Sequence, residues 1–160
     1  MKSQTLKRLT VKKGEFLQRR GELDTKVYYV RSGLLRSFCV DEKGKEHIFM
    51  FAPEGWIVAD SGPPEKPSSL NIQALEDSVV LMSEKALDIK PDFPRIVRRM
   101  EALQNRVIML MSASALERYE DFVNTYPDIV QRVSQKMIAS YLGITPQALS
   151  KVKREIYDKR

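Results

Sequence analysis

Residues 133–156 read VSQKMIASYLGITPQALSKVKREI, and this stretch decides the architecture of the C-terminal part of the chain. Ser134 can cap a short helix, and Gly143 can end it in the left-handed conformation that glycine adopts readily. Thr145 suits the N-cap of a second helix, and Pro146 suits its first residue. The pattern therefore predicts two helices joined by a tight turn.

The two predicted helices, over 135–142 and from Pro146 towards Tyr157, carry apolar residues on facing sides. Ala139 supplies a small residue where the helices cross. A generic helical hairpin is the alternative, but the small residue, the glycine and the apolar positions all fall where a helix-turn-helix requires them. These apolar positions are Ile138, Leu142, Ile144, Leu149, Val152 and Ile156.

The opposite face of the second helix is polar and basic. The first turns of a recognition helix enter the major groove of DNA, where Gln pairs with adenine and Lys with guanine acceptors. We therefore expect base contacts from Gln147, Ser150 and Lys151, although Lys151 also suits a phosphate. We expect phosphate contacts from Lys136, Thr145, Lys153 and Arg154.

The charge distribution supports a double-stranded DNA partner. The chain has 160 residues and a net charge of +6. Residues 131–160 hold seven basic residues against two acidic ones, so this segment carries +5 of that charge. A localised basic patch is typical of proteins that bind a phosphate backbone. Charge alone fits a solvated basic tail equally well.

Residues 9–83 have the pattern of a β-rich domain, because short apolar or alternating runs are separated by turn residues. Strands this short and regular favour an antiparallel sandwich or jelly roll. The proline-rich segment 61–69 is expected to be a loop. The expected strands are Leu9–Val11, Phe16–Leu17, Val27–Val30, Leu34–Val40, His47–Phe51, Trp56–Val58, Leu70–Leu75 and Val79–Met82.

From Pro94 the apolar period becomes helical. A seam with spacings of 4, 3, 4 and 3 residues predicts one long helix to Ser112, with Asp92 as its cap. A narrow seam suits a partner helix and thus a homodimer; the alternative is packing on the chain's own β-domain. The seam residues are Ile96, Met100, Leu103, Val107 and Leu110.

A further helix is predicted after this seam. Ser114 and Glu117 have the spacing of a capping box. Tyr126-Pro127 should end the helix, because the residue before proline resists helical geometry. Its apolar face is expected to comprise Leu116, Tyr119, Phe122 and Val123.

These motifs together resemble the Crp–Fnr family of bacterial regulators over nearly the whole chain. The resemblance includes DEKGKEH, FAPEGW and IQALEDSVVLMSEKAL, and the segments SALERYEDFVNTYP and IASYLGITPQALSKVKREI resemble a Bacteroidetes-type short subgroup. It implies an α+β fold: a cyclic-nucleotide-binding-like β-roll sensor domain over 1–90, a dimerisation helix over 91–112, and a DNA-binding helix-turn-helix over 113–160. RNA polymerase is a further partner that the resemblance implies.

The chain departs from that family in its ligand cassette. The family's Gly-Glu pair and Arg-Ser/Thr-Ala run align with Ala59-Asp60 and Ser68-Ser69-Leu70, so the arginine that clamps a cyclic phosphate is absent. We therefore expect a degenerate pocket at Ala59, Asp60, Ser68 and Ser69 that senses an unknown ligand or none. A cyclic-nucleotide response remains the alternative if another arginine, such as Arg36, reaches the pocket.

The sequence argues against an enzyme. A jelly-roll metalloenzyme needs several converging ligands, whereas His47 is the single histidine and its neighbour Glu46 should point to the other face of the strand. We expect no catalytic residue, no metal and no cofactor. An interaction module without DNA binding is the other alternative. We expect Cys39 to be a buried structural thiol and Trp56 to belong to the core.

Two absences in the sequence bear on location. There is no apolar run long enough to cross a membrane and no secretory signal, so we expect a cytoplasmic protein without a membrane partner.

Overall fold

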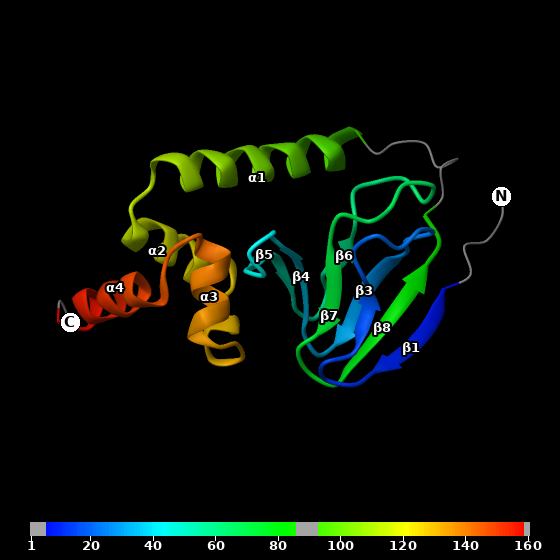
Figure 1. The fold of residues 1–160 in the computed structure, drawn as a ribbon, viewed down its shortest axis with the longest axis horizontal. Coiled ribbons are helices and arrows are strands. Elements are labelled where there is room, and N and C mark those ends of the chain that lie inside the picture. Colours follow the sequence, from blue (N-terminus) through cyan, green and yellow to red (C-terminus); the bar gives the residue numbers. More distant parts are fainter. Residues whose placement is uncertain (1–5, 86–92, 159–160) are drawn as a thin grey trace. The chain divides into compact units, whose positions relative to one another are not determined.

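The computed structural model describes residues 6–85 and 93–158, and the chain divides into two compact units, Met1–Leu87 and Asp88–Arg160. The first unit is β-rich and the second helical, which confirms the predicted α+β class (Figure 1). All eight predicted strands are present, within one or two residues at each end. They are β1 Lys7–Val11, β2 Phe16–Gln18, β3 Val27–Ser32, β4 Leu35–Val40, β5 Glu46–Ala52, β6 Ile57–Ala59, β7 Asn71–Ala74 and β8 Ser78–Ser83.

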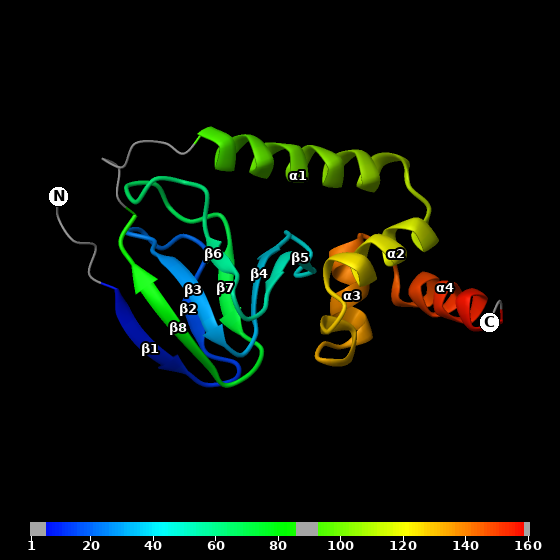
Figure 2. The same cartoon turned by 180° about the vertical axis from the view of Figure 1, so that it is seen from behind.

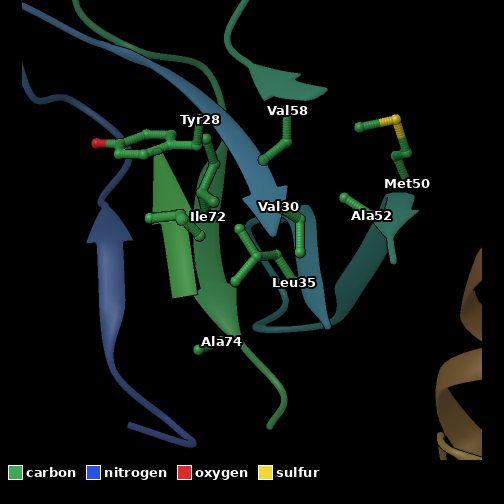
Figure 3. Packing of buried hydrophobic residues seen from close by; sticks show 9 residues of the cluster. Tyr28, Val30, Leu35, Met50, Ala52, Val58, Ile72 and Ala74 are labelled. Atoms are coloured by element: carbon green, nitrogen blue, oxygen red, sulfur yellow. The ribbon is translucent and has the colours of Figure 1, made fainter. Parts of the chain in front are cut away.

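The strands form two antiparallel four-stranded sheets, in the orders β1-β8-β3-β6 and β2-β7-β4-β5. Residues from the inner faces of both sheets pack into one core, with Tyr28 and Val30 from one sheet and Leu35 and Ile72 from the other (Figure 3). Tyr28 is buried and donates its hydroxyl to the Leu17 carbonyl at 2.8 Å, whereas Tyr29 is half-exposed. This alternation across β3 is what the sequence predicts for a half-buried strand.

Three isolated residues of the β-unit were given roles from sequence. Trp56 packs against the core, as expected. His47 lies on β5, with its Nε2 2.8 Å from an Asp41 carboxylate oxygen. The expectation of a buried Cys39 is wrong: its side chain is half-exposed. Burial decreases over the last two residues of β4, Cys39 and Val40, and both lie outside the core cluster.

The second unit contains four α-helices, α1 Phe93–Ser112, α2 Ala115–Thr125, α3 Gln135–Leu142 and α4 Pro146–Asp158 (Figure 2). The predicted capping box is present, since Ser114 and Glu117 bond to each other's backbone amides. Helix α2 ends before Tyr126, as the following proline predicts. The proposed cap Asp92 lies outside the described residues. A short 3-10 helix, Ile129–Gln131, was not predicted.

A substitution at Gly33 should show how tightly the β-unit is packed. Gly33 has a φ of +91°, and a Cβ there would lie 2.7 Å from the Asp77 carbonyl and closer still to the buried Ser78 side chain. Gly33→Ala should therefore cost about 2–4 kcal/mol, from backbone strain and a steric clash together. Urea unfolding followed by the fluorescence of Trp56, the chain's one tryptophan, measures this loss.

The matched control is Gly44→Ala. Gly44 also has positive φ, at +78°, but nothing lies within 4 Å of its Cβ position. This variant should lose only the conformational term, about 1 kcal/mol. Equal losses in the two variants would contradict the packing argument.

Candidate nucleic-acid interface and ligand pocket

The turn between α3 and α4 has the geometry predicted from its residues. The Ser134 hydroxyl accepts the Met137 amide at 3.2 Å, and Thr145 Oγ1 accepts the Ala148 amide at 3.1 Å. Gly143 adopts the left-handed conformation with a φ of 66°. Each cap satisfies a backbone amide that its helix leaves without a partner, so both helices begin where the sequence places them.

Helices α3 and α4 share one apolar core. Ile138, Leu142, Leu149 and Val152 are buried, and Ala139 is buried where close approach was expected. Ile144 and Ile156, also predicted for this core, are only partly buried. Phe122 of α2 and Tyr126, the residue that follows α2, form an aromatic cluster with Tyr141 of α3, with ring centroids 5.4–5.5 Å apart. The helix-turn-helix is therefore part of a packed three-helix group.

The face of α4 opposite this core is exposed. Gln147, Ser150, Lys151 and Arg154 are all exposed, and their spacing of three and four residues places them along one stripe. All three predicted base contacts therefore lie on the same solvent-facing surface. The structure brings them together because burial of Leu149 and Val152 fixes the rotation of the helix.

Of the predicted phosphate contacts, Arg154 belongs to this stripe, and the other three lie on α3, at the turn and on the flank of α4. Lys136 and Thr145 are exposed. The Thr145 hydroxyl accepts one hydrogen bond from the Ala148 amide and can still donate one to another acceptor. Lys153 is half-buried and donates to Gln135 Oε1 at 3.1 Å, which ties α4 to the first turn of α3. A Lys ammonium has three donors, so Lys153 can still bond a phosphate.

One predicted base contact has a restricted role. The Ser150 hydroxyl donates to the Pro146 carbonyl at 2.9 Å, one turn earlier. While this bond holds, Ser150 can only accept a hydrogen bond from a base. Spacing arguments cannot reveal this restriction, because it depends on the side-chain rotamer.

Helix α1 exposes an apolar stripe that includes three of the five predicted seam residues, Ile96, Met100 and Val107. Met100 and Val107 are 65% and 54% exposed, whereas Leu103 and Leu110 are partly buried. Residues beside the seam that the sequence analysis did not single out are also exposed. They are Phe93, Val97, Ile108 and Met111. The exposed apolar surface is therefore broader than a strict coiled-coil seam.

In the predicted ligand cassette, the Asp60 carboxylate accepts hydrogen bonds from the cassette's own loop. Asp60, only 5% exposed, accepts the Gly62 amide at 2.9 Å and the Ser69 amide at 2.8 Å. It also accepts the Ser69 hydroxyl at 2.9 Å and the Leu70 amide at 3.1 Å. Burial opposes ionisation of this carboxyl, but the amide and hydroxyl donors outweigh burial and lower the pKa of Asp60.

Lys85 and Ser68 make further hydrogen bonds that hold the same loop in place. Lys85 Nζ donates to Thr25 Oγ1 at 2.6 Å and to the Gly62 carbonyl at 2.7 Å. Burial lowers the pKa of Lys85, and the nearby charge of Asp60 opposes that shift. Ser68 is buried and donates its hydroxyl to the Arg19 carbonyl at 2.7 Å. Ala59, in contrast, is the last residue of β6, where it pairs with Val27 of β3.

Arg36 does not replace the missing arginine of the cassette. It lies next to Leu35 on β4, so its side chain leaves the face of the sheet opposite the core. Its guanidinium forks onto Glu46, at 2.6 and 3.2 Å, and onto Gln73 Oε1, at 3.0 and 2.8 Å. The ring of Phe38 stacks 4.0 Å below it. The alternative in which Arg36 clamps a phosphate inside the roll is therefore wrong.

Neither a cluster of metal ligands nor a membrane-spanning helix is present in the described residues. Within residues 6–85 and 93–158, no three His, Cys, Asp or Glu side chains gather as they would around a metal ion. No helix in the part of the chain that the structure describes is long and apolar enough to cross a membrane.

Comparison with known proteins agrees with this architecture. The model of the cyclic nucleotide-binding domain family matches residues 8–86. The chain is 29% identical over 163 residues to the transcriptional activator protein Anr of Pseudomonas aeruginosa, a match covering 89% of this chain and 67% of that relative. It is 27% identical over 165 residues to the fumarate and nitrate reduction regulatory protein of Escherichia coli K12, covering 89% and 65%. The chain thus spans about two thirds of these relatives' length.

Solved structures share the fold. FixK2 from Bradyrhizobium japonicum superposes with a TM-score of 0.78 at 22% identity, covering 97% of this chain and 86% of that one. A CRP/FNR-family regulator from Thermus thermophilus gives 0.76 at 14% identity, covering 96% and 87%. The β-unit thus matches the cyclic nucleotide-binding domain family, and the order of the elements together with the two regulator relatives makes the chain as a whole similar to transcription regulators of the Crp–Fnr family.

Proposed function

We propose that this chain is a dimeric, sequence-specific DNA-binding regulator. The observation that carries the proposal is the exposed polar stripe of α4, Gln147, Ser150, Lys151 and Arg154, held out by a buried apolar face. A helix presented in this way can enter the major groove, where amide and ammonium donors distinguish base edges. Gln147 and Lys151 are our candidates for base contacts.

The phosphate contacts follow from the same surface. Arg154 lies within the stripe, and Lys136, Thr145 and Lys153 lie on the same helix-turn-helix. Each of the four can donate to a phosphate oxygen. Such contacts set affinity and register, whereas base contacts set sequence preference. The recognition residues differ from the family's usual arginine pattern, so the operator must be found by selection.

We propose α1 as the dimerisation helix, with the sensor domain over 1–90, this helix over 91–112 and the DNA-binding domain over 113–160. The exposed apolar stripe around Met100 and Val107 is the support. Isolated exposed apolar residues are ordinary, but a continuous stripe along one helix is typical of a contact surface. Two copies would present recognition helices about 34 Å apart, one turn of the duplex.

We propose that the pocket does not hold a cyclic nucleotide tightly. The donors that a cyclic phosphate would use, at Ser69 and Leu70, are already bonded to Asp60. The phosphate would also meet the negative charge of that carboxylate, and neither Ser68 nor Arg36 supplies a guanidinium there. A different effector, or none, fits the site better.

The DNA contacts can be separated by mutation. Lys153→Ala and Arg154→Ala should weaken binding to all sequences, and each should reduce the salt slope by about one unit. Gln147→Ala should instead relax discrimination at one base pair, by about 1–3 kcal/mol. Anisotropy titrations at several salt concentrations, with an operator selected from genomic fragments, measure both effects. Lys43→Ala, at an exposed turn of the β-unit, is the charge-matched control.

Unaltered affinity in all three variants would show that α4 is not the recognition helix. A wild-type protein that retains no genomic fragment would instead favour an interaction module without DNA binding.

The dimer is tested by charge in the α1 stripe. Leu103→Glu with Val107→Glu places like charges opposite each other across a two-fold interface, so the variant should sediment as a monomer at micromolar concentration. Asn105→Glu, on the opposite side of the same helix, should leave the dimer intact. A wild-type protein that is itself monomeric would contradict this assignment.

Calorimetric titration tests the pocket. Cyclic AMP and cyclic GMP should show no tight binding, because loss of a bidentate charged pair costs on the order of 10²–10⁴ in affinity. As a second readout, about 1 mM nucleotide should leave the thermal unfolding midpoint of the Trp56 signal unchanged. A dissociation constant in the low micromolar range or below would overturn the assignment of the cassette.

A further inference from the structure

Three helices of the second unit meet at one guanidinium. Arg118 lies in the first turns of α2, and two of its nitrogens bond the end of α1: Nη2 donates to the Leu110 carbonyl at 2.8 Å and Nε to the Ala113 carbonyl at 3.0 Å. Its Nη1 donates to the Leu142 carbonyl at the end of α3, at 3.1 Å. The last carbonyls of a helix have no intrahelical donor and carry partial negative charge. One cation therefore satisfies two helix ends.

A second arginine holds the same end of α3. Arg106, on α1, donates from Nη2 to the Tyr141 carbonyl at 3.2 Å. Its guanidinium also stacks 3.8 Å from the centroid of the Tyr141 ring, which is buried in the aromatic cluster. The carbonyls of the last two residues of α3 are thus bonded to arginines of α1 and α2.

The short turn after α3 carries this attachment to α4. The Gly143 Cβ position lies 3.7 Å from Arg118 Nη1 and 3.7 Å from Leu110 Cδ2, so the turn lies directly against the arginine and the end of α1. The Ile144 amide bonds back to the Ala139 carbonyl at 3.0 Å. Because only residues 143–145 separate the two helices, α4 follows the orientation of α3.

We propose that Arg118, supported by Arg106, is the positioning residue that fixes the dimerisation helix against the helix-turn-helix and so sets the spacing of the two DNA half-sites. This inference rests on the dimeric DNA binding proposed above. Arginine suits the role because its nitrogens point in fixed, separate directions, whereas a lysine offers one nitrogen. Without Arg118, each recognition helix keeps its own base contacts but loses its fixed placement relative to α1.

The test compares operators that differ only in half-site spacing. Inserting one base pair turns one half-site by roughly 35° and moves it by about 3.4 Å, so a rigid dimer should lose affinity on the altered operator. In Arg118→Met the ratio of the two affinities should shrink by at least about tenfold, because tenfold is the effect of losing only one of its three charge-assisted bonds. Binding to a single half-site should stay within about twofold of wild type.

Arg98→Met, which removes the same charge from an exposed position of α1, is the matched control and should keep the wild-type spacing ratio. If Arg118→Met loses helical circular dichroism, Arg118→Lys carries the test. Its single nitrogen cannot replace donors that reach two helix ends, so its spacing ratio should lie between wild type and complete loss. A folded Arg118 variant that keeps the wild-type ratio overturns the proposal.

A measurement without DNA separates this inference from the proposed function. Spin labels at Glu101→Cys on α1 and Glu155→Cys on α4, in a Cys39→Ser background, report the distance between these two positions within one chain. Labelled chains diluted with excess unlabelled protein give only intrachain distances. The distance distribution should be narrow in wild type and Arg98→Met, and broad in Arg118→Met.

If the distance distribution in Arg118→Met is as narrow as in wild type, Arg118 does not fix α1 against the helix-turn-helix, whatever the DNA results. A wild-type chain that binds no DNA would overturn the proposed function and the effect on half-site spacing. The distances between the spin labels would still decide whether Arg118 fixes α1 against the helix-turn-helix.

Discussion

The buried contact between α3 and α4 holds every residue of the proposed DNA surface in place. Leu149 and Val152 of α4 and Ile138 and Leu142 of α3 are all buried where the two helices meet, and the left-handed turn at Gly143 connects the helices there. Once those side chains are buried, the rotation of α4 is fixed. The polar stripe on its other side then has only one direction in which to point, which is towards solvent.

In the β-unit, an internal carboxylate organises the loop of the predicted ligand cassette. The buried Asp60 carboxylate accepts hydrogen bonds from amide and hydroxyl donors of a loop whose residues are mostly exposed. Hydrogen bonds to a charged acceptor are stronger than neutral ones, so this internal anion stabilises the loop without any bound molecule. Lys85 adds a bond from the end of the strand region to the same loop.

Arginine has a different use in each unit. Arg36 is buried on the outer face of its sheet, where Glu46 neutralises it and Phe38 stacks on it. Arg106 and Arg118 bond carbonyls at helix ends, where the helix dipoles supply the negative charge. Arg154, by contrast, remains exposed on α4 and is free to face a phosphate backbone. Net charge therefore says little about which cations are available to DNA.

The sequence by itself determined the elements and their caps, because these depend on residues close together in the chain. Apolar periodicity located eight strands and the four main helices, and Ser134, Gly143 and Thr145 marked helix ends by local hydrogen bonding. Only the tertiary structure decided the partners of Asp60, Arg36 and Arg118, because they lie 2–10, 10–37 and 5–24 residues away in sequence and no local pattern specifies them. The same reason explains the error at Cys39, because the point along β4 at which burial ends depends on what packs around the strand and not on the strand's own pattern.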